Sequence, residues 1–170
     1  MSGMTVRAGW VGRFFEDFEI GDVYEHGLGR TVTQADNIWI TLLTQNTARV
    51  HFDAHYAAQT EFGRPLVNSA FTVALVTGQS VSDVSYNVMA NLGWDEVRLP
   101  NPLFEADTVY SWSEVVAKRE SRSRPEVGIV TVRTTGTNQD GVPVITFSRT
   151  VMVYRRGMGP TPGPGGARPS

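Results

Sequence analysis

The sequence contains no cysteine among its 170 residues. Disulfide bonds, thiolate nucleophiles and cysteine-ligated zinc sites are therefore excluded. The chain also lacks a strong charge imbalance, because 17 acidic side chains stand against 15 basic ones and the formal net charge is -2. Binding to the phosphates of nucleic acid requires a concentrated basic surface, so we expect no nucleic-acid partner.

Long apolar runs are missing as well. No window approaches the roughly 18 consecutive apolar residues of a membrane-spanning helix, so we expect no membrane-spanning segment and no membrane partner. The first ten residues, MSGMTVRAGW, lack the apolar core of a secretory signal peptide. These two absences predict a cytoplasmic protein.

Histidine is scarce, with three in the chain. His51 and His55 are close enough in sequence to bind one metal ion together, but no convincing third ligand lies nearby, so we expect no metal site. His26 lies in a glycine-rich segment, and the sequence predicts no functional role for it.

The overall composition is that of a globular protein, with 41% hydrophobic and 19% charged residues. We expect a loose N-terminal arm at residues 1–12 and a single domain at residues 13–156. Glycine and proline dominate residues 157–170 without any apolar pattern, so we expect this tail to be disordered.

The first half of the domain carries helix signals. Thr33, followed three residues later by Asp36, resembles a capping box and predicts a helix over 34–45. Asp53 is typical of the N-cap of a short helix over 53–63, which Gly63 ends. Residues 69–82 are apolar almost all round and follow Asn68, so they predict a helix capped by Asn68 or Ser69. Such a helix must be wrapped, normally by a sheet.

The second half carries strand signals instead. Runs rich in β-branched and aromatic residues predict strands over 107–118, 127–138 and 142–154, with a short strand over 95–99 and a first strand over 24–32. Asp140-Gly141 between the last two long strands is typical of a hairpin turn. The fold class predicted from these elements is α+β, with a mostly antiparallel sheet and a central helix.

Two stretches of the chain resemble a known family. HFDAHYAAQTEFGRPLVNS (51–69) resembles the hydratase signature of MaoC-like (R)-specific enoyl-CoA hydratases, and VRLPNPLFEADTVY (97–110) resembles a second stretch of that family. The run RESRSRPEVGIVTV (119–132) looks most like the branch that contains mesaconyl-CoA hydratase, also called β-methylmalyl-CoA dehydratase. The resemblance spans roughly residues 14 to 155. It implies a hot-dog fold, a homodimer or higher homo-oligomer, and an acyl-CoA substrate.

The chain departs from the family signature at its first position. Asn46 stands where the family has a catalytic Asp, five residues before the His. Ala48-Arg49 replaces an Asn-Pro pair, whereas His51 and Asp53 stand where the family has them. Ser69 replaces the glycine that commonly opens the central helix.

Hydration of an enoyl thioester requires a base for the attacking water, a proton for the α-carbon and donors for the thioester oxygen. His51 is the expected base, because imidazole exchanges protons near neutral pH. An amide cannot accept a proton, so Asn46 is expected to position water or substrate. The backbone N–H groups of Ser69 and Ala70, at a helix start, are the expected oxyanion hole.

Two acids near the signature have two roles open to them. Asp53 can serve as a helix cap or as a second acid, and capping is the role that its position favours. Asp36 can cap its own helix, or it can reach the site if that helix folds back over it.

A basic cluster, Lys118, Arg119, Arg122 and Arg124, also has two interpretations. It is either a solvated hairpin tip or a clamp for the phosphates of coenzyme A, for which the planar guanidinium of arginine is suited.

The hypothesis for the whole chain is an acyl-CoA hydratase or dehydratase that adds water reversibly to a short, branched or dicarboxylic 2-enoyl-CoA. It would need no cofactor, since coenzyme A enters as part of the substrate. Two alternatives stay open: a hot-dog thioesterase, and a non-catalytic acyl-CoA-binding protein that has lost the catalytic Asp to Asn46.

Overall fold

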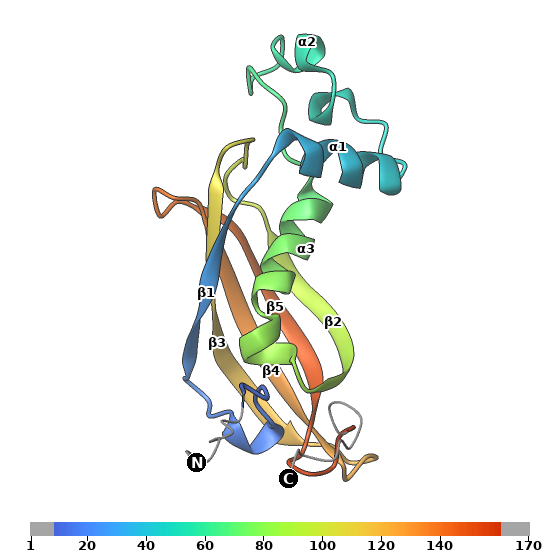
Figure 1. The fold of residues 1–170 in the computed structure, drawn as a ribbon, viewed down its shortest axis with the longest axis vertical. Coiled ribbons are helices and arrows are strands. Elements are labelled where there is room, and N and C mark those ends of the chain that lie inside the picture. The colour runs from blue at the N-terminus through green and yellow to red at the C-terminus, as the bar shows by residue number, and fades with distance from the viewer. Residues whose placement is uncertain (1–8, 161–170) are drawn as a thin grey trace, which may run out of the picture.

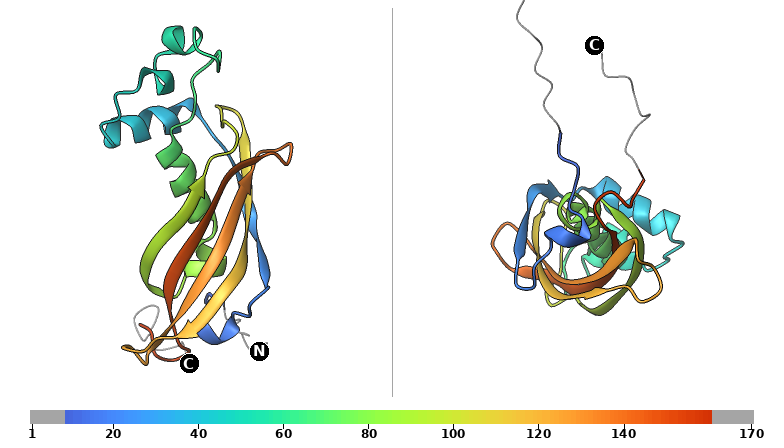
Figure 2. Two further views of the ribbon diagram at one scale, coloured as in Figure 1. Left: turned by 180° about the vertical axis from the view of Figure 1, so that it is seen from behind. Right: turned by 90° about the horizontal axis from the view of Figure 1, so that it is seen from below.

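A computed structural model describes residues 9–160. Parts of the predicted arm (1–8) and of the predicted tail (161–170) lie outside these residues. A five-stranded antiparallel sheet of order β1-β3-β4-β5-β2 curls around helix α3 (Ser69–Gln79), as Figures 1 and 2 show. The strands are β1 (Val23–Thr31), β2 (Val88–Arg98), β3 (Thr108–Glu120), β4 (Val127–Thr137) and β5 (Pro143–Tyr154). The predicted α+β class, with a central helix wrapped by an antiparallel sheet, is confirmed.

The other helices are short. They are η1 (Phe15–Asp17), α1 (Gln34–Leu43), η2 (Arg49–His51), α2 (Ala54–Ala57) and the π-helical turn η3 (Val81–Ser85). The predicted capping box of α1 is present, because the Thr33 N–H donates to Asp36 Oδ2 at 2.8 Å and the Asp36 N–H donates back to Thr33 Oγ1 at 3.4 Å. The helix predicted over 53–63 is wrong in length. It stops at Ala57, whose carbonyl accepts a hydrogen bond from the Thr60 hydroxyl at 2.7 Å.

Four of the five strands match their predicted ranges to within two residues at each end. The prediction for β2 is wrong at its start, because the strand begins at Val88 instead of residue 95. This edge strand pairs with β5 through three register shifts, so its sequence shows no regular alternation of apolar and polar residues. Gly141 adopts φ +75° in the predicted hairpin turn, a conformation that glycine tolerates without strain.

A polar layer divides the core into two apolar clusters. Along β5 the order is Phe147 in one cluster, buried Arg149, then Val151 in the other cluster. The same order recurs on the helical side, where buried Ser80 separates Val76 from Val84. Most buried polar groups in proteins have hydrogen-bond partners, because burial without one is costly, and hydrogen bonds organise much of this layer.

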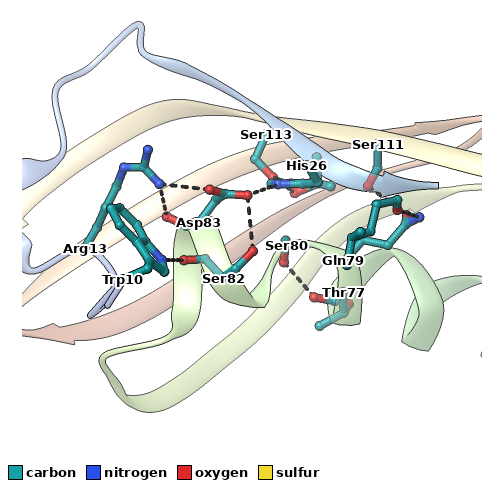
Figure 3. Close-up of polar contacts among 12 residues, drawn as sticks. Trp10, Arg13, His26, Thr77, Gln79, Ser80, Ser82, Asp83, Ser111 and Ser113 are labelled. Atoms are coloured by element: carbon teal, nitrogen blue, oxygen red, sulfur yellow. Dashed lines mark hydrogen bonds and ion pairs between the residues drawn. The ribbon is translucent and has the colours of Figure 1, made fainter. Parts of the chain in front are cut away.

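His26 lies at the centre of that layer (Figure 3). Its Nδ1 lies 3.1 Å from Asp83 Oδ2, and because an ionised carboxylate only accepts hydrogen bonds, Nδ1 carries the proton. Nε2 then accepts from the Ser113 hydroxyl at 2.9 Å, and Ser113 accepts from the Thr134 hydroxyl at 2.8 Å. Arg13 donates to the other Asp83 oxygen at 3.1 Å. The network joins β1, β3, β4 and η3, a structural role that the sequence did not predict for His26.

Burial disfavours positive charge on the side chains of this layer. Burial lowers the pKa of His26 below its usual 6.5, and the positive charges of Arg149 and Arg13 act in the same direction, while Asp83 offsets part of the effect. Burial also lowers the pKa of Arg149 to about 10. Within residues 9–160, the Nε and Nη2 atoms of Arg149 have no hydrogen-bond partner. The folded chain therefore favours a neutral His26 ring.

This preference makes stability depend on pH. The unfolded His26 ring takes up a proton near pH 6.5, whereas the folded ring resists protonation, so the free energy of unfolding should fall as pH decreases below about 6.5. Burial alone would raise the pKa of Asp83, but hydrogen bonds from His26 and Arg13 outweigh it and leave that pKa below 3.8, outside this window. Urea unfolding between about pH 7.5 and pH 5 should show the decrease, and His26→Gln should flatten it. Equal pH slopes for the two proteins would contradict the assignment.

Candidate functional site

The candidate site lies where the chain leaves the sheet. Residues 34–68, which include α1, η2 and α2, project beyond one end of the sheet, above the N-terminus of α3 (Figure 1). This projecting segment contains four of the residues that the sequence singled out, Asp36, Asn46, His51 and Asp53. The structure therefore brings His51 and the start of α3 to the same end of the molecule.

Asn37 ties this end together. The side chain is buried, and its Nδ2 donates to the His51 carbonyl at 2.7 Å and to the Leu66 carbonyl at 3.0 Å. Its Oδ1 accepts from the Asn68 N–H at 2.8 Å. One side chain on α1 thus binds the turn that carries His51, the segment that follows α2, and the cap of α3. Each of these bonds satisfies a backbone group next to the site.

The His51 ring is oriented by the same segment. Nδ1 lies 2.8 Å from the Leu66 carbonyl, and because a carbonyl only accepts, Nδ1 carries the proton of the neutral ring. Nε2 then keeps its lone pair. The half-buried ring is held in the tautomer that a general base requires.

The start of α3 offers one open backbone donor. Asn68 is the N-cap, and its Oδ1 accepts from the Ala70 N–H at 2.9 Å. The Ala70 amide is therefore occupied, whereas no hydrogen bond of residues 9–160 uses the amide of exposed Ser69. Ser69 and Thr72 line an apolar pocket of about 210 Å³, together with Phe62 and residues 99–103. Of the two predicted oxyanion donors, the amide of Ser69 is the one without a partner among residues 9–160, and Ser69 lines this pocket.

The other predicted site residues make no hydrogen bond to the His51 ring within residues 9–160. Asn46 Oδ1 accepts from the Ala48 N–H at 2.9 Å, and Asn46 lines a separate pocket of about 460 Å³ beside α1. Asp53 caps α2 by accepting from the Tyr56 N–H at 2.9 Å, and Arg49 donates to it at 2.6 Å. The hydrogen bond from Tyr56, followed by that from Arg49, lowers the pKa of Asp53.

Asp36 is held even more firmly. Nη1 and Nη2 of Arg30 donate to it, at 2.5 and 2.7 Å, and these bonds hold the pKa of Asp36 well below its usual range. Asp36 and Asp53 therefore act as ion-paired helix caps, one of the two roles that the sequence left open for each.

The basic cluster lies at the opposite end of the sheet. Lys118 and Arg119 end β3, and Arg122 and Arg124 belong to the β3–β4 connection. β3 has 13 residues, so about 40 Å of strand separates this connection from the end that carries His51, at ~3.4 Å per residue. Lys118 Nζ donates to the Phe18 carbonyl at 2.6 Å, while Arg119 and Arg122 line an open pocket.

The structure also bears on a catalytic triad, a metal site and a membrane-spanning helix. Asp83, His26 and Ser113 have the donor order of a hydrolase triad, but Ser113 is fully buried and cannot reach a substrate. Among residues 9–160, no group of three or more His, Cys, Asp or Glu side chains is placed to hold a metal ion. In the same residues no helix is long and apolar enough to cross a membrane.

Sequence relatives identify the family of the chain. The pattern of the mesaconyl-CoA hydratase family matches residues 6–169. The chain belongs to the mesaconyl-CoA hydratase family. The β-methylmalyl-CoA dehydratase of Chloroflexus aurantiacus is 33% identical to it, over 84% of this chain and 45% of that protein. The predicted MaoC-like resemblance is thereby confirmed.

Solved structures of family relatives extend the agreement to three dimensions. A MaoC domain protein from Chloroflexus aurantiacus superposes with a TM-score of 0.84 and 29% identity, over 97% of this chain and 46% of that one. A Mycobacterium tuberculosis protein described as a double hotdog fold gives a TM-score of 0.78 and 25% identity, over 91% of this chain and 47% of that one. Residues 9–160 thus form a hot-dog unit, and the chain spans less than half the length of these relatives.

Sequence reasoning missed Asn37, although a signal was present. Asn37 and Thr41, four residues apart, are the buried residues of α1, whereas Trp39, Leu42 and Leu43 are exposed. A polar pair at helical spacing inside an apolar helix marks a face that packs against backbone groups.

Proposed function

We propose that this chain catalyses the reversible addition of water to a short 2-enoyl-CoA, as an acyl-CoA hydratase or dehydratase. The observation that carries the proposal is the His51 ring. Its Nδ1 is bound to the carbonyl of Leu66, which lies three residues before Ser69 at the start of α3, and Nε2 is left as a base. Family membership supports the same reaction.

The chemistry uses these groups in order. Nε2 of His51 takes a proton from water as the water oxygen attacks C3 of the enoyl group, and the π electrons move to the thioester oxygen. The Ser69 N–H, at the positive end of the α3 dipole, stabilises that oxygen. The imidazolium returns its proton to C2, which completes the 3-hydroxyacyl thioester and restores the neutral ring. No cofactor enters this cycle.

For the substrate we propose a branched or dicarboxylic short-chain enoyl thioester. The family is named for mesaconyl-CoA, and the Chloroflexus relative is named for β-methylmalyl-CoA. The apolar pocket of about 210 Å³ at the start of α3 suits a short acyl group. A CoA thioester carries phosphates that prevent passive passage through a membrane, so we place the reaction in the cytoplasm.

We further propose that the active form is a homodimer. The α1 residues Trp39, Leu42 and Leu43 are between 67% and 73% exposed, and Phe52 and Tyr56 add to the same projecting segment, a combination typical of an interface. The relatives are about twice as long as this chain, and one of them is a double hot-dog. In the proposed dimer, a second copy of this chain takes the place of the second half of these longer relatives.

A dimer also gives the basic cluster a role. If the β2 edges of two copies lie antiparallel, the β3–β4 connection of one copy comes to the end of the sheet that carries the other copy's His51. Arg119, Arg122 and Arg124, with Lys118, would then meet the phosphates of coenzyme A bound to the partner, for which arginine's planar fork is suited.

His51→Ala tests the reaction. The wild-type chain should remove the conjugated thioester absorbance of mesaconyl-CoA or crotonyl-CoA, and His51→Ala should lower kcat by about 10²–10⁴-fold, the usual contribution of a general base. His55→Ala, on exposed α2, is the matched control and should keep wild-type turnover. The proposal fails if no enoyl-CoA is hydrated, or if a folded His51→Ala chain turns over like the wild type.

Leu43→Glu tests the dimer. A carboxylate in the α1 interface should shift the sedimentation coefficient from dimer to monomer at micromolar concentration, because an unpaired charge is costly to bury. Leu28→Glu is the matched control, since Leu28 is 80% exposed on β1, away from α1, and should leave the dimer intact. A monomeric wild type, or a Leu43→Glu chain that stays dimeric, would contradict the arrangement.

A further inference from the structure

The His51 ring borders a slit that has room for one water molecule. The cavity measures about 10 Å³, the space that a single water needs, and it is lined by His51, Asn37 and Glu105 among others. Glu105 comes from the 97–110 stretch, more than 50 positions after His51 in the sequence. It is the only carboxylate among the described residues that line this slit.

The backbone fixes Glu105 in this place. The Val67 N–H donates to the Leu103 carbonyl at 2.9 Å, and Leu66 pairs with Phe104 in an isolated antiparallel bridge. On the other side, the Ala106 N–H donates to the Val32 carbonyl at 2.9 Å. Glu105 is thereby held between the segment that binds the His51 ring and the chain that leads into α1.

Backbone strain marks the same turn. Ala106 adopts φ 72°, a left-handed conformation that a residue with a Cβ rarely occupies. Such a conformation costs roughly 1 kcal/mol or more and persists where the surroundings enforce it. The turn is further closed by Asp107, whose Oδ2 accepts from the Phe104 N–H at 2.9 Å.

Other carboxylates near the site are already engaged. Asp36 is bound by Arg30, and Asp53 is bound by Arg49 and by the Tyr56 amide. In contrast, no hydrogen bond or ion pair of residues 9–160 engages the exposed Glu105 carboxylate. Asn46, which replaces the family's acid, lines a different pocket. Glu105 is thus free to bind a water in the slit.

We propose that Glu105 is the catalytic carboxylate of this site and holds the attacking water together with His51. The inference rests on the proposed hydratase function. The water donates one hydrogen to Nε2 of His51 and the other to the Glu105 carboxylate, so its oxygen lone pair faces C3 of the enoyl group. As the C3–O bond forms, the proton on the His51 side moves to Nε2 and then to C2. The second hydrogen stays on the new hydroxyl group, and the ionised Glu105 balances the transient imidazolium charge.

Glu105→Gln tests the role. The amide keeps the size of the side chain but loses its charge, so kcat for enoyl-CoA hydration should fall by at least about 100-fold, while KM stays within about threefold. The melting temperature should stay at the wild-type value, because Glu105 makes no bond within residues 9–160. Glu105→Asp restores the charge and should recover at least about tenfold of the lost kcat.

Glu61→Gln is the matched control, because Glu61 is also exposed in the projecting segment but does not line the slit, and it should keep wild-type kcat. Wild-type kcat in Glu105→Gln, together with an inactive His51→Ala, would overturn the role of Glu105 and leave the hydratase function standing. A loss in Glu105→Gln that follows a lower melting temperature would also overturn it, as a structural effect. A wild-type chain that hydrates no enoyl-CoA would overturn both proposals.

Discussion

The arrangement of the site depends on the three hydrogen bonds of one buried amide. Asn37 binds the carbonyls of His51 and Leu66 and the N–H of Asn68, so the base-bearing turn and the start of α3 share one anchor on α1. A buried amide with its hydrogen-bonding groups satisfied stabilises one arrangement, because every shifted one leaves a buried backbone group without a partner. A hydrophobic residue in this place would fill the space without fixing the turn relative to the helix. The geometry of the proposed reaction follows from this anchor.

Because the polar side of α1 faces the site, the apolar side of the helix faces away from it and is exposed. The exposed Trp39, Leu42 and Leu43 are therefore a consequence of how the site is built. In the longer relatives the protein continues beyond one hot-dog unit. In the proposed dimer a second copy covers this side, and basic residues of one copy come near the histidine of the other.

How much could be read from the sequence depends on the range of each interaction. The caps of α1, α2 and α3 and the turn at Gly141 were predictable, since each is decided by residues within a few positions. The His26–Asp83 pair joins residues 57 positions apart, and the Asn37–Asn68 bond spans 31. Neither has a local signal, because tertiary packing alone brings the partners together. The family resemblance located His51 but not Glu105, which enters the slit from a separate stretch of chain.

The central claim is that Asn37 holds His51 and the start of α3 in the geometry that hydration requires. The most direct measurement is the kcat of Asn37→Ala for enoyl-CoA hydration, taken at a temperature at which circular dichroism shows the variant folded. We predict a loss of at least about tenfold, because a displacement of about 1 Å can cost up to 100-fold in rate. Leu28→Ala, at an exposed position of β1 away from α1 and β2, should keep the wild-type rate. A folded Asn37→Ala chain with wild-type kcat would contradict the account.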